Sequence, residues 1–219
     1  TEILFKKIND TPTASAKIII GGGSRIESVD QQGLTEMLTR IWPSATATKN
    51  EAEYLKIIEE SAAGLNSFGG KNTNGLSVEY MKPFEKTMLD LTAEVVTKPV
   101  LSQDIFTREM DVLKKQILSK QDNPSYLCGR QFLQMMFPQT VMSYEQSGTL
   151  ETLNNISLKD VEKSFNKFRA IGNMQVAVAG DYDRSRWIDI VEKMEDSFTL
   201  HGRQLKSVPI AKLAENKEQ

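Results

Sequence analysis

The helix that decides the fold of this chain begins with the stretch GLTEMLTR at residues 33–40. It follows a β-branched strand at 14–21 that leads into the glycine-rich stretch GGGSR at 21–25. Between residues 31 and 42 apolar side chains recur with the spacing of one helical face, and Pro43 ends the run. That face consists of Leu34, Met37, Leu38, Ile41 and Trp42. The sequence therefore predicts a strand, a glycine-rich turn and an amphipathic helix packed on the core.

Strand and helix patterns follow one another along the rest of the chain. Alternating apolar residues indicate strands, and apolar residues at helical spacing indicate helices. The order ββααββ, then several helices, then βα, predicts an α+β fold with a largely antiparallel sheet covered by helices. The predicted strands are 3–7, 14–21, 65–68, 76–81 and 174–179, and the predicted helices are 31–42, 50–63, 85–98, 103–121, 124–136, 158–168 and 184–198.

The length of 219 residues suits one large domain, which we place at residues 1–203. No internal repeat or low-complexity tract divides this part of the sequence. The stretch at 204–219 is polar and carries several lysines. We predict that it is a linker or a frayed C-terminal tail toward a missing second domain.

Composition describes an ordinary soluble globular protein, with a formal charge of −2 and 39% hydrophobic residues. There is no basic excess of the kind that binds nucleic acid or anionic lipid, so neither partner is expected. The apolar runs are far shorter than the roughly twenty residues that span a bilayer. The compartment is not readable from the sequence, and a periplasmic or organellar location fits only if a leader was removed upstream.

The nitrogen and sulfur ligands that zinc sites normally include are almost absent, because the chain has one histidine, His201, and one cysteine, Cys128. Zinc sites in proteins draw on histidine, cysteine and carboxylate ligands. The sequence therefore predicts no metal site in this domain. A single cysteine also excludes an intrachain disulfide and, without a histidine nearby in sequence, gives no sign of cysteine catalysis.

Six local sequences, in the right order over most of the chain, resemble those of peptidase family M16, which includes pitrilysin, insulinase and the mitochondrial processing peptidase. They are similar to the family patterns "aGsrdE", "gTatrs", "LNAfT", "l.nPlf", "rrdnP" and "lvvvGdvd". The resemblance implies an M16 metallopeptidase domain of the LuxS/MPP-like fold, which agrees with the predicted order of strands and helices. The matching stretches are 22–28, 46–51, 65–68, 98–100, 120–124 and 176–181.

The zinc-binding and catalytic residues of the family are missing from this sequence. In active members the first helix carries H-x-x-E-H, where two histidines bind zinc and the glutamate activates water. In this sequence Glu36 and Arg40 stand at the histidine positions and Thr39 at the glutamate position. The third zinc ligand of active members is a glutamate on the long helix, and Gln116 stands there. The resemblance therefore implies an inactive, zinc-less domain, with zinc expected only in the active half.

The replacements also have a physical interpretation. A neutral amide is a poorer zinc ligand than a carboxylate, and Arg40 brings a positive charge to the place of the cation. Glu36 and Arg40 stand four residues apart, which is the spacing of a helical ion pair. We expect a modest surface ion pair between them.

Enzymes of this family enclose peptides between two homologous halves. Each half consists of two similar domains, and commonly only one half keeps zinc. The chain resembles the first domain of the zinc-less half. The resemblance implies a non-catalytic domain that forms part of the peptide-enclosing chamber, within a parent zinc metalloendopeptidase. The expected partners are an active half or domain, in cis or as a separate subunit, and a peptide substrate.

Residues 65–68 match an edge strand that pairs with extended substrate in active members, a β-augmentation mode. The candidate peptide-binding residues are accordingly Leu65, Asn66, Ser67 and Phe68. The alternative is that Leu65 and Phe68 only pack into the sheet, while the glycines that follow shape a turn.

Two other functions remain open from the sequence. One is a structural or assembly subunit that is homologous to the processing peptidase and has no proteolytic role. The other is an enzyme with a different active site, for which the sequence offers acids such as Asp104 and Asp111 but no pairing of base and nucleophile. A hydrophobic partner surface would favour the first, and a pocket of convergent polar groups would favour the second.

Overall fold

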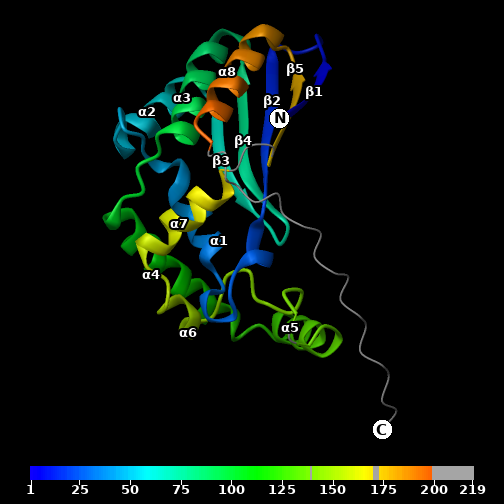
Figure 1. Cartoon of the computed structure of the whole chain (residues 1–219), viewed down its shortest axis with the longest axis vertical. Helices are drawn as coiled ribbons and strands as arrows, with labels where there is room; N and C mark the ends of the chain where they lie inside the picture. The colour runs from blue at the N-terminus through cyan, green and yellow to red at the C-terminus, as the bar shows by residue number, and fades with distance from the viewer. Residues whose placement is uncertain (139, 170–172, 199–219) are drawn as a thin grey trace.

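A five-stranded mixed sheet forms the centre of the computed structural model, which describes residues 1–138, 140–169 and 173–198 (Figure 1). The strand order is β1-β5-β2-β4-β3. β1 is parallel to β5 and every other pairing is antiparallel, so the predicted α+β fold with a largely antiparallel sheet is confirmed. The strands are β1 (Glu2–Lys7), β2 (Thr13–Gly21), β3 (Gly64–Gly69), β4 (Thr73–Met81) and β5 (Met174–Gly180).

All the predicted helices are present; α5 and α7 have the predicted bounds, and the ends of the others are shifted by up to three residues. α1 begins at residue 34 and not at 31, because Gly33 adopts a φ of 100°, a left-handed conformation that ends the preceding turn. The four-residue α6 was not predicted, since it is too short to show helical periodicity. The helices are α1 (Leu34–Ile41), α2 (Glu51–Glu60), α3 (Glu85–Thr97), α4 (Gln103–Lys120), α5 (Pro124–Met136), α6 (Leu150–Leu153), α7 (Leu158–Phe168) and α8 (Arg184–Asp196).

The two faces of the sheet have different surroundings. In β2, Ala16 and Ile18 are buried whereas Ser15 and Lys17 are exposed, and β4 continues the pattern with exposed Glu79. Because successive strand residues point to opposite faces, one whole face lies in the core and the other stays open in the described part of the chain. The buried face packs against α1 and α3, and α3 packs in turn against α8 (Figure 1).

A buried polar network joins the sheet to α3 and α8. Trp187 is fully buried and its Nε1 donates a hydrogen bond to the Tyr80 hydroxyl at 2.9 Å. That hydroxyl donates to Glu85 at 3.1 Å, and the backbone N–H of Asp183 donates to the same carboxylate at 2.7 Å. Lys82 lies 2.9 Å from the other Glu85 oxygen, so this carboxylate, only 1% exposed, has partners at both oxygens.

α1 lies between β3, α4 and α7. Its approach to β3 depends on Gly69, where an added Cβ would come within 2.8 Å of the Thr39 side chain. The predicted core face of α1 is confirmed, because Met37, Leu38 and Ile41 are all fully buried. α1 is therefore held in a fixed position against the edge of the sheet.

Glu27 caps the N-terminus of α1, where Gly33 offers no side chain to do so. Its carboxylate accepts hydrogen bonds from the backbone N–H groups of Gly33 at 3.0 Å and Thr35 at 2.6 Å. Burial raises the pKa of the Glu27 carboxyl, although these hydrogen bonds oppose the shift. The cap thus combines a favourable interaction with the helix end and a cost of desolvation.

Replacing Glu27 with alanine is expected to lower the free energy of unfolding by about 1 to 2 kcal/mol, because two backbone donors lose their acceptor. Since the folded pKa of Glu27 lies above the unfolded value, the contribution of this side chain is complete below pH 4.5 and declines as pH rises through the folded pKa. Denaturant unfolding of the original protein and of Glu27→Ala, at acidic and at neutral pH, measures this contribution. If the difference in free energy of unfolding between the two proteins grew toward neutral pH, the raised pKa of Glu27 would be contradicted.

The predicted boundary at residue 203 and the tail at 204–219 lie outside the described residues. Within the described part of the chain, no helix combines the length and apolar character that crossing a bilayer requires.

Candidate functional site

Three of the four degenerate positions meet at the junction of α1 and α4. Glu36 and Arg40 lie on one face of α1, and Gln116 on α4 faces them. Thr39 does not join this group, because its hydroxyl donates to the backbone carbonyl of Glu36 and its own carbonyl accepts a hydrogen bond from Ser67. The Thr39 hydroxyl, at the position of the family's glutamate, is therefore hydrogen-bonded within its own helix.

The guanidinium of Arg40 occupies the centre of this junction. Its Nε donates to Glu36 Oε1 at 2.9 Å, and its Nη2 donates to Gln116 Oε1 at 2.6 Å. Its Nη1 lies 3.7 Å from Glu109 Oε2 on α4. The expected ion pair of Glu36 and Arg40 is present, but about four fifths of each side chain is buried and the contacts cross between helices, so it is more than a surface pair.

Glu109 is the residue that sequence reasoning missed. It stands seven residues before Gln116, so two turns of α4 place both on the face toward α1. Glu109 also lies 3.4 Å from Arg108, which binds Glu51 of α2 through two N–H groups at 2.7 and 3.2 Å. The Arg108 hydrogen bonds lower the pKa of the Glu51 carboxyl. A chain of ion pairs thus links α1, α4 and α2.

These residues do not fit a zinc ion. A fixed positive charge lies among the donor groups, and the oxygen donors of Glu36 and Gln116 are already hydrogen-bonded to it. Among residues 1–138, 140–169 and 173–198, no group of three or more histidine, cysteine and acidic side chains is arranged to hold a metal ion. The arrangement joins α1 to α4 through the Arg40 guanidinium.

We expect the loss of Arg40 to weaken this junction. Arg40→Ala is predicted to lower the free energy of unfolding by about 1 to 2 kcal/mol, because Glu36 is left partly buried without its cation and Glu109 keeps only Arg108. The matched control is Lys86→Ala, which removes an exposed ion pair between Lys86 (77% exposed) and Asp90 (50% exposed) and should cost about 0.5 kcal/mol or less. Equal losses in the two variants, measured by denaturant titration, would contradict an organising role for Arg40.

The predicted peptide-binding segment is the edge strand β3, whose one strand partner among the described residues is β4. Leu65 is buried, Ser67 and Phe68 are half-buried and Asn66 is exposed. Parts of the free edge are already occupied: the Tyr54 hydroxyl donates to the carbonyl of Leu65 at 2.9 Å, and Gln146 donates to that of Gly69 at 2.8 Å. An added strand would have to compete with these side chains.

Lys71 fastens the turn after β3 to the segment between α5 and α6. Its ammonium donates to the backbone carbonyls of Val141 at 3.2 Å, Met142 at 2.5 Å and Tyr144 at 3.4 Å. Burial lowers the pKa of the Lys71 ammonium. Lys71 therefore serves a structural purpose in this turn.

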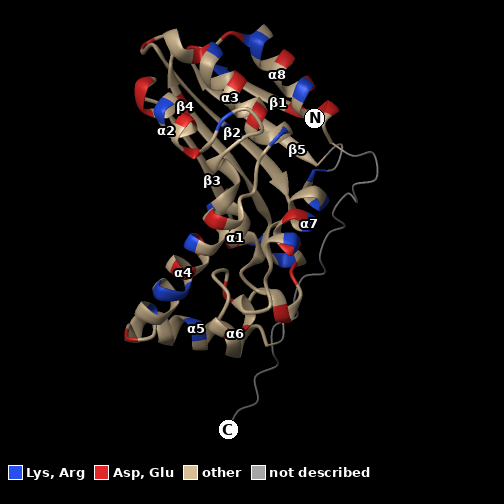
Figure 2. Ribbon diagram, turned by 90° about the vertical axis from the view of Figure 1, so that its left-hand side faces the viewer, with Lys and Arg blue, Asp and Glu red and all other residues tan. Residues whose placement is uncertain are grey.

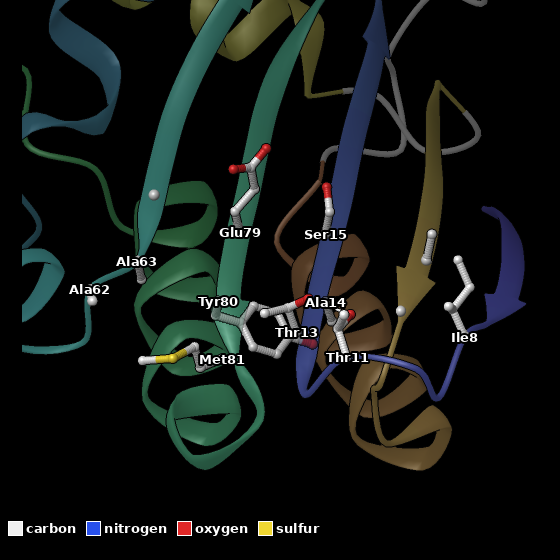
Figure 3. Close-up of a pocket in the computed structure, with 13 residues that line it drawn as sticks. Ile8, Thr11, Thr13, Ala14, Ser15, Ala62, Ala63, Glu79, Tyr80 and Met81 are labelled. Atoms are coloured by element: carbon white, nitrogen blue, oxygen red, sulfur yellow. Dashed lines mark hydrogen bonds between the residues drawn. The ribbon is translucent and has the colours of Figure 1, made fainter.

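A cavity of about 660 Å³ lies on the open face of the sheet (Figure 3), and none of the residues of the Arg40 junction lines it. Its lining combines hydroxyls of Thr11, Thr13 and Ser15 with apolar groups such as Ile8 and Met81. Glu79 is the only charged side chain in the lining. Ser15 and Glu79 lie opposite each other on β2 and β4, and with this single carboxylate the lining is not a pocket of convergent charged groups.

Comparison with known proteins establishes the family. Residues 2–152 match the family model for insulinase, peptidase family M16, so the chain belongs to this family. It is 24% identical over 192 residues to an uncharacterized zinc protease of Mycobacterium leprae, covering 88% of this chain and 43% of that protein. It is 20% identical over 179 residues to a protein of Helicobacter pylori named "non-peptidase homolog", covering 82% of this chain and 41% of that protein.

Two solved structures share the fold. The peptidase M16 inactive domain from Pseudomonas fluorescens superimposes with a TM-score of 0.82 at 20% identity, covering 90% of this chain and 48% of that one. A protease from Helicobacter pylori gives a TM-score of 0.83 at 19% identity, covering 97% and 51%. The chain thus spans about half the length of the relatives that it matches.

Proposed function

We propose that this chain is the non-catalytic domain of an M16-type zinc metallopeptidase, where it forms part of the chamber that encloses peptides. Another half of the enzyme carries the zinc and cleaves the peptide. The observation that supports this most directly is the Arg40 guanidinium, which bridges Glu36 on α1 and Gln116 on α4 at the positions of the family's zinc ligands. A domain that keeps the fold but has an arginine side chain at these positions can form part of the chamber wall without catalysing a reaction.

The open face of the sheet supports this proposal. It carries small and polar side chains such as Ser15, Lys17 and Glu79, which leave the sheet accessible to an extended chain. Enclosing a peptide excludes bulk water and orients the substrate, and both effects assist catalysis elsewhere in an enzyme. The edge strand β3, with Leu65, Asn66, Ser67 and Phe68, is the proposed place of direct peptide contact.

The alternative function is an assembly subunit without proteolytic role. One observation favours it: α5 exposes large apolar side chains, among them Phe132 at 58% and Met135 at 71%. Exposed apolar groups of this size are typical of surfaces that bind another protein.

Peptide hydrolysis and bound zinc, measured together for this chain and for its full parent protein, test the proposal. We expect activity and zinc only in the parent, and chelation to remove both. Hydrolysis by the 219-residue chain alone would overturn the proposal. An inactive, zinc-free parent that stays inactive with its partner subunits would favour the assembly role.

A further inference from the structure

α5 is a helix without a place in the core of the domain. It runs for 13 residues, and no residue in it is buried. A helix of this length is marginal in water by itself, because most helical stability in proteins comes from packing one face against a core. Figure 1 shows α5 at the lower end of the molecule, away from the sheet. Its stability therefore depends on the contacts that its partly exposed side chains make.

One side of α5 is tied to the segment that follows it. The Tyr126 hydroxyl donates to Glu145 at 2.8 Å, and Arg130 Nε lies 3.6 Å from the same carboxylate. Burial and the Glu145 carboxylate raise the pKa of Tyr126 to about 12. These contacts fix the inner face of the helix and leave the opposite face outward.

The outer face of α5 is apolar and uncharged. Cys128, Phe132 and Met135 lie four and then three residues apart, which places them on one stripe opposite Tyr126 and Arg130. Phe132 is 58% exposed, Met135 is 71% exposed and Cys128 is exposed as well. In Figure 2 this helix is largely free of charged residues. A partner of this stripe must be apolar, because no ion pair is available on it.

The area of the stripe indicates whether its partner is a separate chain or a part of the same polypeptide. Thirteen residues at about 1.5 Å each give a strip about 20 Å long and about 200 Å² in area. A stable complex of separate chains buries about 800 Å² on each partner, so two copies joined through α5 alone would not hold together. A covalently linked partner needs far less area, because linkage raises its effective concentration to the millimolar range.

We propose that the outer face of α5 docks against the remainder of the parent polypeptide. The relatives of this chain are about twice its length, which supplies that partner: the chain covers 43% of one and 41% of another. The inference rests on the part of the proposed function that places this domain in a longer protein. It adds the surface through which the domain holds its companion in position.

Cys128 is a built-in probe of this contact, since it lies on the outer face and is the only cysteine of the chain. Its rate of alkylation by a small maleimide can be followed by mass mapping of the labelled peptide, in the 219-residue chain and in the full parent. We expect labelling about tenfold slower in the parent, because the docked face opens only transiently. Equal rates in the two proteins would overturn the proposal.

A matched control probes a surface that α5 does not share. Cys128→Ser combined with Leu55→Cys moves the thiol to α2, where Leu55 is 48% exposed. We expect equal labelling in the chain and the parent at this position. In the parent, Phe132→Ser with Met135→Ser should restore rapid labelling of Cys128, while the melting temperature of the 219-residue chain stays unchanged because neither side chain is buried.

The alternative occupant is a second copy of the chain. Labelling of Cys128 in the 219-residue chain that slows as protein concentration rises would identify that occupant and overturn the proposal. The labelling requires neither zinc nor peptide, so its outcome is independent of the hydrolysis assay. An inactive parent in which Cys128 is protected would contradict the peptidase function and leave the docking surface intact.

Discussion

A variant that carries Glu36→His, Thr39→Glu, Arg40→His and Gln116→Glu is expected to bind one zinc ion per chain. α1 presents positions 36 and 40 on one face, and α4 brings position 116 to them, as the 2.6 Å contact of Arg40 Nη2 with Gln116 Oε1 shows. Two histidines and a glutamate are a sufficient ligand set for a zinc site that keeps one open position. Zinc at about 100 times its dissociation constant should raise the free energy of unfolding by about 2.7 kcal/mol.

The control for this variant keeps the arginine. Glu36→His, Thr39→Glu and Gln116→Glu with Arg40 retained should bind no zinc, because the guanidinium still occupies the position of the cation. Metal content after gel filtration and the shift of melting temperature with added zinc measure both proteins. Equal zinc binding by the two would show that Arg40 does not stand in the cation's place.

The second large effect is expected at Glu85, in the network between the sheet, α3 and α8. Glu85→Ala should lower the free energy of unfolding by about 3 kcal/mol, because the Tyr80 hydroxyl and the Asp183 N–H lose their common acceptor and Lys82 loses its ion pair. Marginal stability of about 5 to 15 kcal/mol is typical of domains, so this is a large fraction.

Glu79→Ala is the matched control, since Glu79 lies on the neighbouring strand β4 but is exposed. It should change the free energy of unfolding by about 0.5 kcal/mol or less. The fluorescence of Trp42 and Trp187, which are both buried, reports unfolding in denaturant. Similar losses in the two variants would mean that the buried network does not stabilise the fold.

Periodicity alone predicted most of the fold. The alternating apolar residues of β2 and the apolar stripe of α1 each predict which face of the element is buried. The structure places both faces in the core. The parallel pairing of β1 with β5 was not predictable, because those strands are separated by most of the chain and no local signal records which edge they share. α6 escaped prediction because one helical turn has no period.

The sequence identified the residues of the candidate site but not all the contacts between them. The sequence identified Glu36, Arg40 and Gln116, and their spacing on α1 accounts for the first contact. The contribution of Glu109 depends on how α4 crosses α1, which is a matter of packing between helices that are distant in sequence. The peptide-binding role of residues 65–68 stays a prediction.

The cation at the junction of α1 and α4 is covalently part of the chain. A bound metal can be removed by a chelator or withheld when its supply runs low, whereas the Arg40 guanidinium is part of a side chain of α1 and stays with it. The contacts that join α1 to α4 through Arg40 therefore require no metal ion. If the proposed zinc-carrying half loses its metal, this junction keeps its contacts and the domain keeps the position of α1 against α4.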